Sequence, residues 1–137
     1  MHVYIGGASN GKRSFVRETL KNQDFRWFEG ALPDPGNDAV VIAGIEKWLE
    51  NTTYSEAEVV SHVMEIARGR EAIFILTDIG RGIVPIDAKQ RELRDVCGRL
   101  YQKLTAEAEE VTRIWYGIAQ IIKKGEKTNE DLHKNRR

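Results

Sequence analysis

The chain has 137 residues, a length typical of one globular domain with its own hydrophobic core. Its 21 Lys and Arg residues balance 21 Asp and Glu residues, so the net charge is zero and there is no bulk basic field to favour nucleic acid. Cys97 is the only cysteine, which excludes an internal disulfide, and no apolar stretch in the sequence reaches membrane-spanning length. Without a secretory signal at its start, the sequence predicts a cytoplasmic protein.

A glycine-rich loop near the start of the chain is the most informative motif. It lies between an expected strand at 2–6 and an expected helix at 11–22, and its Gly6, Gly11 and Lys12 have Walker A spacing. In such a loop, backbone N–H groups and the helix N-terminus surround phosphate oxygens, and the lysine reaches the β and γ phosphates. An ordinary glycine-rich turn is the alternative. The predicted nucleotide-binding residues are Gly6, Gly7, Ala8, Ser9, Asn10, Gly11, Lys12, Arg13 and Ser14.

The loop departs from the Walker A pattern at the residue after the lysine. The pattern has Ser or Thr there, whose hydroxyl coordinates Mg²⁺. This chain has Arg13, and the hydroxyl follows one position later at Ser14. A shift of one residue turns a side chain by about 100° around a helix, so Ser14 cannot simply replace the missing group. The candidate Mg²⁺ ligands are Ser14 and Asp78, and we expect nucleotide affinity to depend little on Mg²⁺.

The rest of the sequence alternates between strands and helices. Strands are expected at 25–29, 39–43, 72–77 and 111–117, and helices at 44–51, 55–68 and 86–109. The alternation predicts an α/β fold, a doubly wound and mostly parallel sheet of the P-loop (RecA-like) type, with ligands at the carboxyl ends of the strands. We expect one domain over 1–124 and a flexible tail over 125–137, because the tail has one aliphatic residue among its 13.

A second motif directly follows the expected strand at 72–77. It reads Thr-Asp-Ile-Gly-Arg-Gly-Ile-Val-Pro over 77–85 and brings Asp78 and Arg81 to the edge of the sheet where ligands bind. The helix after it carries Arg94. For Arg94, an exposed helix face with ion pairs to neighbouring turns is the alternative to a functional role.

Together these motifs resemble the bifunctional adenosylcobinamide kinase and adenosylcobinamide-phosphate guanylyltransferase family of cobalamin biosynthesis. The family loop Gly-Gly-Ala-Arg-Ser-Gly-Lys-Ser matches 6–13, its Asn-Glu-Val-Gly-x-Gly-Ile-Val-Pro matches 77–85, and its Arg-Asp-x-x-Gly-Arg-x-x-Gln matches 94–102. Its Trp-Leu-x-Asn element matches 48–51, and its Ser-Gly-Ile-Pro turn matches 116–119. The resemblance implies ATP or GTP as ligand and adenosylcobinamide as the phosphoryl acceptor.

Three departures from the family leave two functions open. Arg13 replaces the loop hydroxyl, Ala43 replaces the metal-holding aspartate that ends the third strand, and the segment that carries the GMP-accepting histidine is missing before Trp27. His62 does not align with that histidine, so guanylyl transfer is expected to be lost. The chain is then either a kinase, or a degenerate paralogue that keeps the nucleotide site for a regulatory or binding role. For the kinase, the resemblance implies catalytic roles for Lys12, Asp78, Arg81 and Arg94.

The sequence also carries many large aromatic residues for a small domain. We expect a homo-oligomer that uses an aromatic and apolar patch, with core packing of these residues as the alternative. The aromatic residues concerned are Tyr4, Trp27, Phe28, Trp48 and Trp115.

Overall fold

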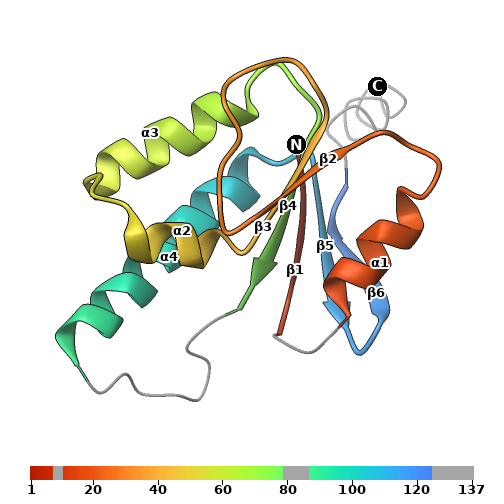
Figure 1. Cartoon of the computed structure of the whole chain (residues 1–137). Helices are drawn as coiled ribbons and strands as arrows, with labels where there is room; N and C mark the ends of the chain where they lie inside the picture. The colour runs from red at the N-terminus through yellow and green to blue at the C-terminus, as the bar shows by residue number, and fades with distance from the viewer. Residues whose placement is uncertain (8–10, 79–86, 125–137) are drawn as a thin grey trace, which may run out of the picture.

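Figure 1 shows the computed structural model of the chain, which describes residues 1–7, 11–78 and 87–124. Three parts of the sequence predictions lie outside these residues: Ala8 to Asn10 of the loop, Arg81, and the tail at 125–137. The elements in chain order are β1 (His2–Gly6), α1 (Lys12–Thr19), β2 (Arg26–Glu29), β3 (Val40–Ala43), α2 (Ile45–Asn51), α3 (Glu56–Ala67), β4 (Ala72–Thr77), α4 (Ala88–Glu107), β5 (Glu110–Trp115) and β6 (Ile118–Lys123).

In the described part of the chain, the strands form one six-stranded sheet in the order β2-β3-β4-β1-β5-β6. β1 lies near the centre, where Tyr4 is in register with Ile75 of β4 and Thr112 of β5. The first five strands are parallel and β6 is antiparallel to β5. The carboxyl ends of the parallel strands therefore meet at one edge, the lower edge in Figure 1. The predicted mostly parallel α/β sheet is confirmed.

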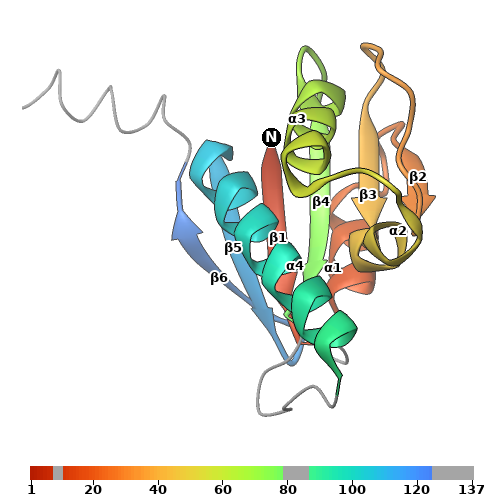
Figure 2. The ribbon, with the colours of Figure 1, turned by 90° about the vertical axis from the view of Figure 1, so that its left-hand side faces the viewer.

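Helices cover both faces of the sheet. α1 packs on one face, and α2, α3 and α4 pack on the other (Figure 2). Successive strand residues point to opposite faces, so Val3 belongs to the core under α2 to α4 and Tyr4 to the core under α1. Each face buries its own apolar layer, as a doubly wound sheet requires. Of the helices that the structure describes, none is long and apolar enough to cross a membrane.

The end of the sheet differs from the sequence prediction. The expected strand at 111–117 ends at Trp115, and a turn at Tyr116 and Gly117 leads into β6, which was not predicted. Both turn residues have positive φ, 52° and 75°, as a two-residue hairpin turn requires. Ile118 to Ile122 are all exposed, so neither face of this strand is buried. The segment therefore lacks the alternation of apolar and polar residues by which a half-buried strand is recognised in a sequence.

Most of the aromatic residues singled out in the sequence pack in the cores, which was the alternative to a surface patch. Tyr4 is buried, and Trp27, Phe28 and Trp48 pack against the two cores. Of the five aromatic residues, Trp115 alone is mostly exposed, at 54%. The reason is that aromatic side chains bury the most apolar area per residue and fill the space between helices and sheet. Exposed large apolar side chains gather instead on the β5–β6 hairpin, at Trp115, Tyr116, Ile118, Ile121 and Ile122.

Candidate functional site

The glycines of the loop are required by the local backbone. A Cβ on Gly6 would lie 2.3 Å from the backbone oxygen of Ile114, so only glycine fits between β1 and β5. Gly11 caps the start of α1 with φ 75°, a conformation that other residues adopt at a cost. No side chain caps the first turn of α1 among the described residues. Its backbone N–H groups thus face the carboxyl edge of the sheet, where an anion would satisfy them.

Lys12 is nearly completely buried at the first position of α1, with 2% of its surface exposed. Its Nζ donates a hydrogen bond of 2.6 Å to the backbone oxygen of Gly7. Burial lowers the pKa of Lys12, nearby Arg13 lowers it further, and the Glu46 carboxylate opposes this shift. Buried lysines are rare unless a partner or a function retains them. The ammonium group of Lys12 is thus held against the backbone of the loop, where a phosphate bound to the loop would also contact it.

Arg13 is held away from the loop by a carboxylate at the end of a neighbouring strand. Its Nε and Nη2 donate to Oε1 and Oε2 of Glu29, the last residue of β2, at 2.7 and 2.8 Å. This bidentate pair raises the pKa of Arg13 and lowers that of Glu29, mainly through the hydrogen bonds. Ser14, the displaced hydroxyl, is exposed on α1. The sequence analysis missed Glu29, whose position at a strand end of the ligand edge was the available signal.

Asp78 comes to the loop from the end of β4. Its backbone N–H donates to the oxygen of Gly6 at 2.9 Å. Asp78 also lines a cavity of 540 Å³ beside the loop, together with Gly6, Gly7, Arg113 and Trp115, and with Ile5 and Ile122. The Arg113 guanidinium lies 5.2 Å from the centre of the Trp115 ring. The sequence analysis assigned neither residue of this pair to the site, although both lie near the carboxyl end of the last parallel strand.

Arg94 is not among the residues that line this cavity. It lies on α4, and its Nε is 4.0 Å from the Asp95 carboxylate. Arg81 lies outside the described residues. The structure thus brings Lys12, Arg13 and Asp78 to one edge of the sheet and does not bring Arg94 into the cavity.

Glu46 is a further residue at this edge that the sequence analysis did not identify. It lies in the first turn of α2, directly after β3. Its Oε2 is buried and has no hydrogen-bond partner among the described residues. Leaving a buried polar atom unsatisfied costs about 1–3 kcal/mol, and more for a charged group. Such atoms often mark functional positions. An acidic residue three positions after the end of a buried strand was the signal in the sequence.

The charge of Glu46 acts on residues from two other elements, α1 and α4. It opposes the lowering of the Lys12 pKa and contributes to the raised pKa of Arg13. On α4, burial first and then Glu46 raise the pKa of Cys97 to about 12, and the pKa of Tyr101 is raised for the same two reasons among others. The charge of Glu46 on α2 therefore influences both the start of α1 and the middle of α4.

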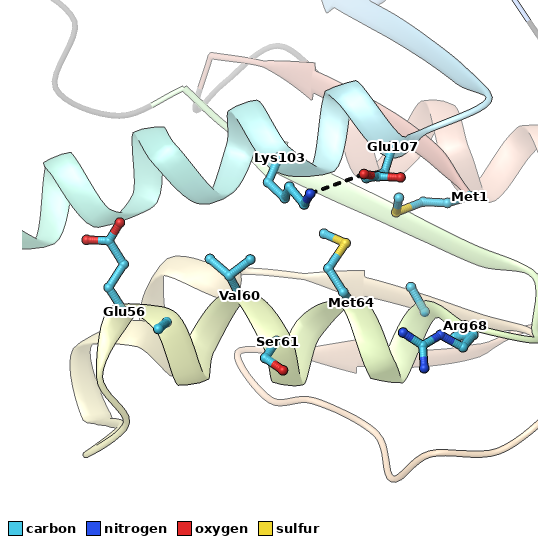
Figure 3. Close-up of a pocket in the computed structure, with 10 residues that line it drawn as sticks. Met1, Glu56, Val60, Ser61, Met64, Arg68, Lys103 and Glu107 are labelled. Atoms are coloured by element: carbon cyan, nitrogen blue, oxygen red, sulfur yellow. Dashed lines mark ion pairs between the residues drawn. The ribbon is translucent and has the colours of Figure 1, made fainter.

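A separate groove runs between α3 and α4, away from the loop (Figure 3). It has a volume of 970 Å³ and is lined by Val60 and Met64 of α3 and by the Lys103–Glu107 ion pair of α4, whose Nζ and Oε1 are 3.2 Å apart. Met1, which precedes β1, also lines it, so this end of the groove reaches the amino edge of the sheet. Since the parallel strands bring their carboxyl ends to the opposite edge, the groove is not part of the loop site.

Comparison with known proteins decides the family. The model of the family described as cobinamide kinase / cobinamide phosphate guanyltransferase matches residues 28–122. The chain belongs to this family. The resemblance predicted from the motifs is thereby confirmed. The matched region begins after the loop, so the assignment of residues 6–14 depends on the sequence pattern and on the geometry described above.

A curated relative is the bifunctional adenosylcobalamin biosynthesis protein CobU of Salmonella typhimurium, which is 38% identical to the chain over 53 residues. The aligned region is 39% of this chain and 29% of that protein. The chain thus spans less than a third of the length of this relative.

Proposed function

We propose that this protein binds a nucleoside triphosphate at residues 6–14 and transfers its γ-phosphoryl group to adenosylcobinamide in cobalamin biosynthesis. The observation that carries the proposal is buried Lys12, which lies at the first turn of α1 with its Nζ on the loop oxygen of Gly7. Among the described residues Lys12 forms no ion pair, and the β and γ phosphates of ATP or GTP would replace the Gly7 oxygen as its partner. Family membership supports the pathway.

The cavity beside the loop supports a place for the acceptor. Trp115 and Ile122 form an apolar wall, and Asp78 and Arg113 supply charges next to Gly6 and Gly7. We propose that the aminopropanol arm of adenosylcobinamide enters here, so that its hydroxyl meets the γ-phosphate above the loop. Asp78 would then orient the hydroxyl or a metal ion. As in the sequence analysis, we propose Arg81 and Arg94 as the groups that neutralise the negative charge that develops during phosphoryl transfer.

The carboxylates at this edge favour a magnesium ion more than the sequence did, because the structure adds Glu46 to the candidate ligands Ser14 and Asp78. Mg²⁺ is commonly held by one or two carboxylates together with substrate phosphates. Among the described residues, no three His, Cys, Asp or Glu side chains gather as a metal site, so the nucleotide would have to complete the coordination. Asp78 and Glu46 are the available carboxylates, and Ser14 remains a candidate on the exposed side of α1. When bound, the ion would neutralise charge on the β and γ phosphates.

A degenerate nucleotide-binding paralogue is the second candidate. The observation that favours it is the Arg13–Glu29 pair, which occupies the loop position where the family has its metal-binding hydroxyl. Ala43 is completely buried and offers no metal ligand at the end of β3. Such a protein would bind nucleotide without transferring phosphate, and would have a regulatory or binding role.

The test of nucleotide binding is calorimetric titration with ATP and with GTP. We expect Lys12→Ala to weaken binding by about 10- to 100-fold, because a hydrogen bond to a charged group contributes about 1.5–3 kcal/mol. Lys21→Ala is the matched control, since Lys21 is exposed and pairs with Glu18. An absence of binding by the wild type at millimolar nucleotide would reject the proposal.

The test of phosphoryl transfer is incubation with adenosylcobinamide and each nucleotide, followed by mass spectrometry of the corrinoid. Typical kinases turn over at about 1–100 per second. A phosphorylated product supports the kinase. Nucleotide binding without any product supports the degenerate paralogue.

Three further proposals follow from the sequence and the family. We propose that guanylyl transfer is lost, because the segment with the GMP-accepting histidine is missing before Trp27. We also propose that the protein is cytoplasmic and that it forms a homo-oligomer.

A further inference from the structure

Glu46 carries a buried carboxylate oxygen that the fold does not explain. This atom, Oε2, has no hydrogen-bond partner among the described residues. Lys12 Nζ donates to the Gly7 oxygen, and the Arg13 guanidinium is held by both oxygens of Glu29. Both cations whose pKa Glu46 influences therefore have other acceptors. The oxygen is therefore placed for a cation that the described residues do not supply.

The backbone at the end of β3 brings this carboxylate to the edge of the sheet. Ala43 ends the strand, and Gly44 turns the chain with φ 68° so that α2 begins at once. A Cβ on Gly44 would lie 2.8 Å from Oε2 of Glu29, so the turn also packs against the Arg13–Glu29 pair. Glu46 thus lies two residues past a turn that its neighbours constrain. Glu46 therefore lies at the same strand end as Ala43, whose side chain offers no metal ligand.

Charge balance at this corner points to a divalent cation. Arg13 and Glu29 compensate each other's charge, and Lys12 is the other cation at the start of α1 on which the charge of Glu46 acts. A nucleotide would draw Lys12 to its phosphates and bring the negative charge of those phosphates near Glu46. Carboxylate and phosphate oxygens are the ligands that Mg²⁺ prefers.

We propose that Glu46 binds the Mg²⁺ of the Mg²⁺–nucleotide complex and supplies the carboxylate that is absent at Ala43. This proposal rests on the proposed nucleotide site. It replaces the expectation from the sequence that nucleotide affinity depends little on Mg²⁺. The ligand set is then Glu46, phosphate oxygens of the nucleotide and water, with Asp78, which lines the cavity beside the loop, as a candidate for a second carboxylate.

The experiment compares the affinity for ATP and GTP with Mg²⁺ and with EDTA, by calorimetry of the whole chain. For the wild type we expect Mg²⁺ to tighten binding by about tenfold or more, a ratio typical of coupled sites. Glu46→Gln keeps the shape of the side chain and removes its charge, so binding should persist but lose its dependence on Mg²⁺. Glu50→Gln is the matched control, because Glu50 is an exposed carboxylate on the same helix. It should behave as the wild type.

Thermal unfolding gives a second readout that needs no activity. A bound ligand raises the melting temperature, so Mg²⁺ with nucleotide should raise it more than nucleotide with EDTA in the wild type and in Glu50→Gln. In Glu46→Gln the two conditions should give the same rise. Melting of the variants without ligand shows that they are folded.

The outcomes separate this proposal from the proposed function. Wild-type binding that is equal with and without Mg²⁺ overturns the role of Glu46 while nucleotide binding stands. Mg²⁺ dependence that survives Glu46→Gln overturns it too, and points to Asp78 or Ser14. A wild type that binds neither nucleotide overturns the proposed function, and this inference with it.

Discussion

Arg13 and Glu29 join the start of α1 to the end of β2 through two parallel hydrogen bonds, Nε to Oε1 at 2.7 Å and Nη2 to Oε2 at 2.8 Å. In the sheet, β3 and β4 separate β2 from β1, so the pair links the edge strand β2 to the helix that follows β1. The residue that breaks the Walker A pattern is therefore not left pointing into the loop. It has a partner of its own, which compensates its charge.

The first prediction concerns the contribution of this pair to stability. Because the Arg13 and Glu29 side chains are 34% and 58% exposed, Glu29→Gln should lower the free energy of unfolding by no more than about 1 kcal/mol at pH 7. The pKa of Glu29 is below its ordinary value of 4.5 in the folded protein, so the contribution is full above that value and is lost as the pH falls through the folded pKa. Urea unfolding at pH 7 and at pH 3 measures the difference.

Glu18→Gln is the control for this measurement. Glu18 pairs with Lys21 on the same side of the sheet, where the two side chains are 76% and 63% exposed. Its substitution should change the free energy of unfolding by a few tenths of a kcal/mol at most. A loss for Glu29→Gln that stays the same at pH 3 would show that the ion pair is not its source.

The second prediction compares two glycines. Gly11 has φ 75°, so Gly11→Ala should lower the free energy of unfolding by about 1 kcal/mol and weaken nucleotide binding. Gly98 lies inside α4, and a Cβ at this position would meet no atom of another element within 4 Å, so Gly98→Ala should raise the free energy of unfolding by about 0.5–1 kcal/mol. Chemical denaturation measures both changes. Equal effects of the two substitutions would contradict the assignment of a left-handed cap at Gly11.

The third prediction is that the protein does not form a GMP adduct. His62 packs in an aromatic cluster, with its ring centre 6.0 Å from that of Trp48 and 5.3 Å from that of Tyr54. These contacts explain the residue as part of the packing between α2 and α3. Incubation with GTP and Mg²⁺, followed by intact-mass spectrometry, should show the unmodified protein. A GMP adduct that disappears in His62→Ala would mean that guanylyl transfer is retained.

The fourth prediction is that copies of the protein associate along β6. This strand is an edge of the sheet within the described residues, and its Ile118 and Ile121 are 71% and 59% exposed. Unpaired backbone groups and exposed aliphatic side chains favour pairing with a second copy. Light scattering at micromolar concentration should give a mass above the 15.6 kDa of one chain. Ile118→Lys should shift the mass to that of the monomer, whereas Gln120→Glu, on the same strand, should not. A wild-type monomer would reject the association.

Local patterns in the sequence were sufficient to predict the architecture. Continuous apolar runs predicted β3 and β4, and the alternation of strands with helices predicted the parallel sheet and its ligand edge. The Gly6, Gly11 and Lys12 spacing placed the loop between β1 and α1. These features follow from the sequence alone because strand burial, helix capping and loop geometry depend on residues that are close together in the chain.

Only the tertiary structure decided which side chains meet at that edge. Arg13 and Glu29 are 16 positions apart, and the charge of Glu46 acts on Lys12 from a helix on the other face of the sheet. The burial of the aromatic residues and the pairing of β6 also depend on how the layers pack. Contacts of this kind result from strand order and helix placement, which bring distant segments together, and no periodicity along the chain encodes them.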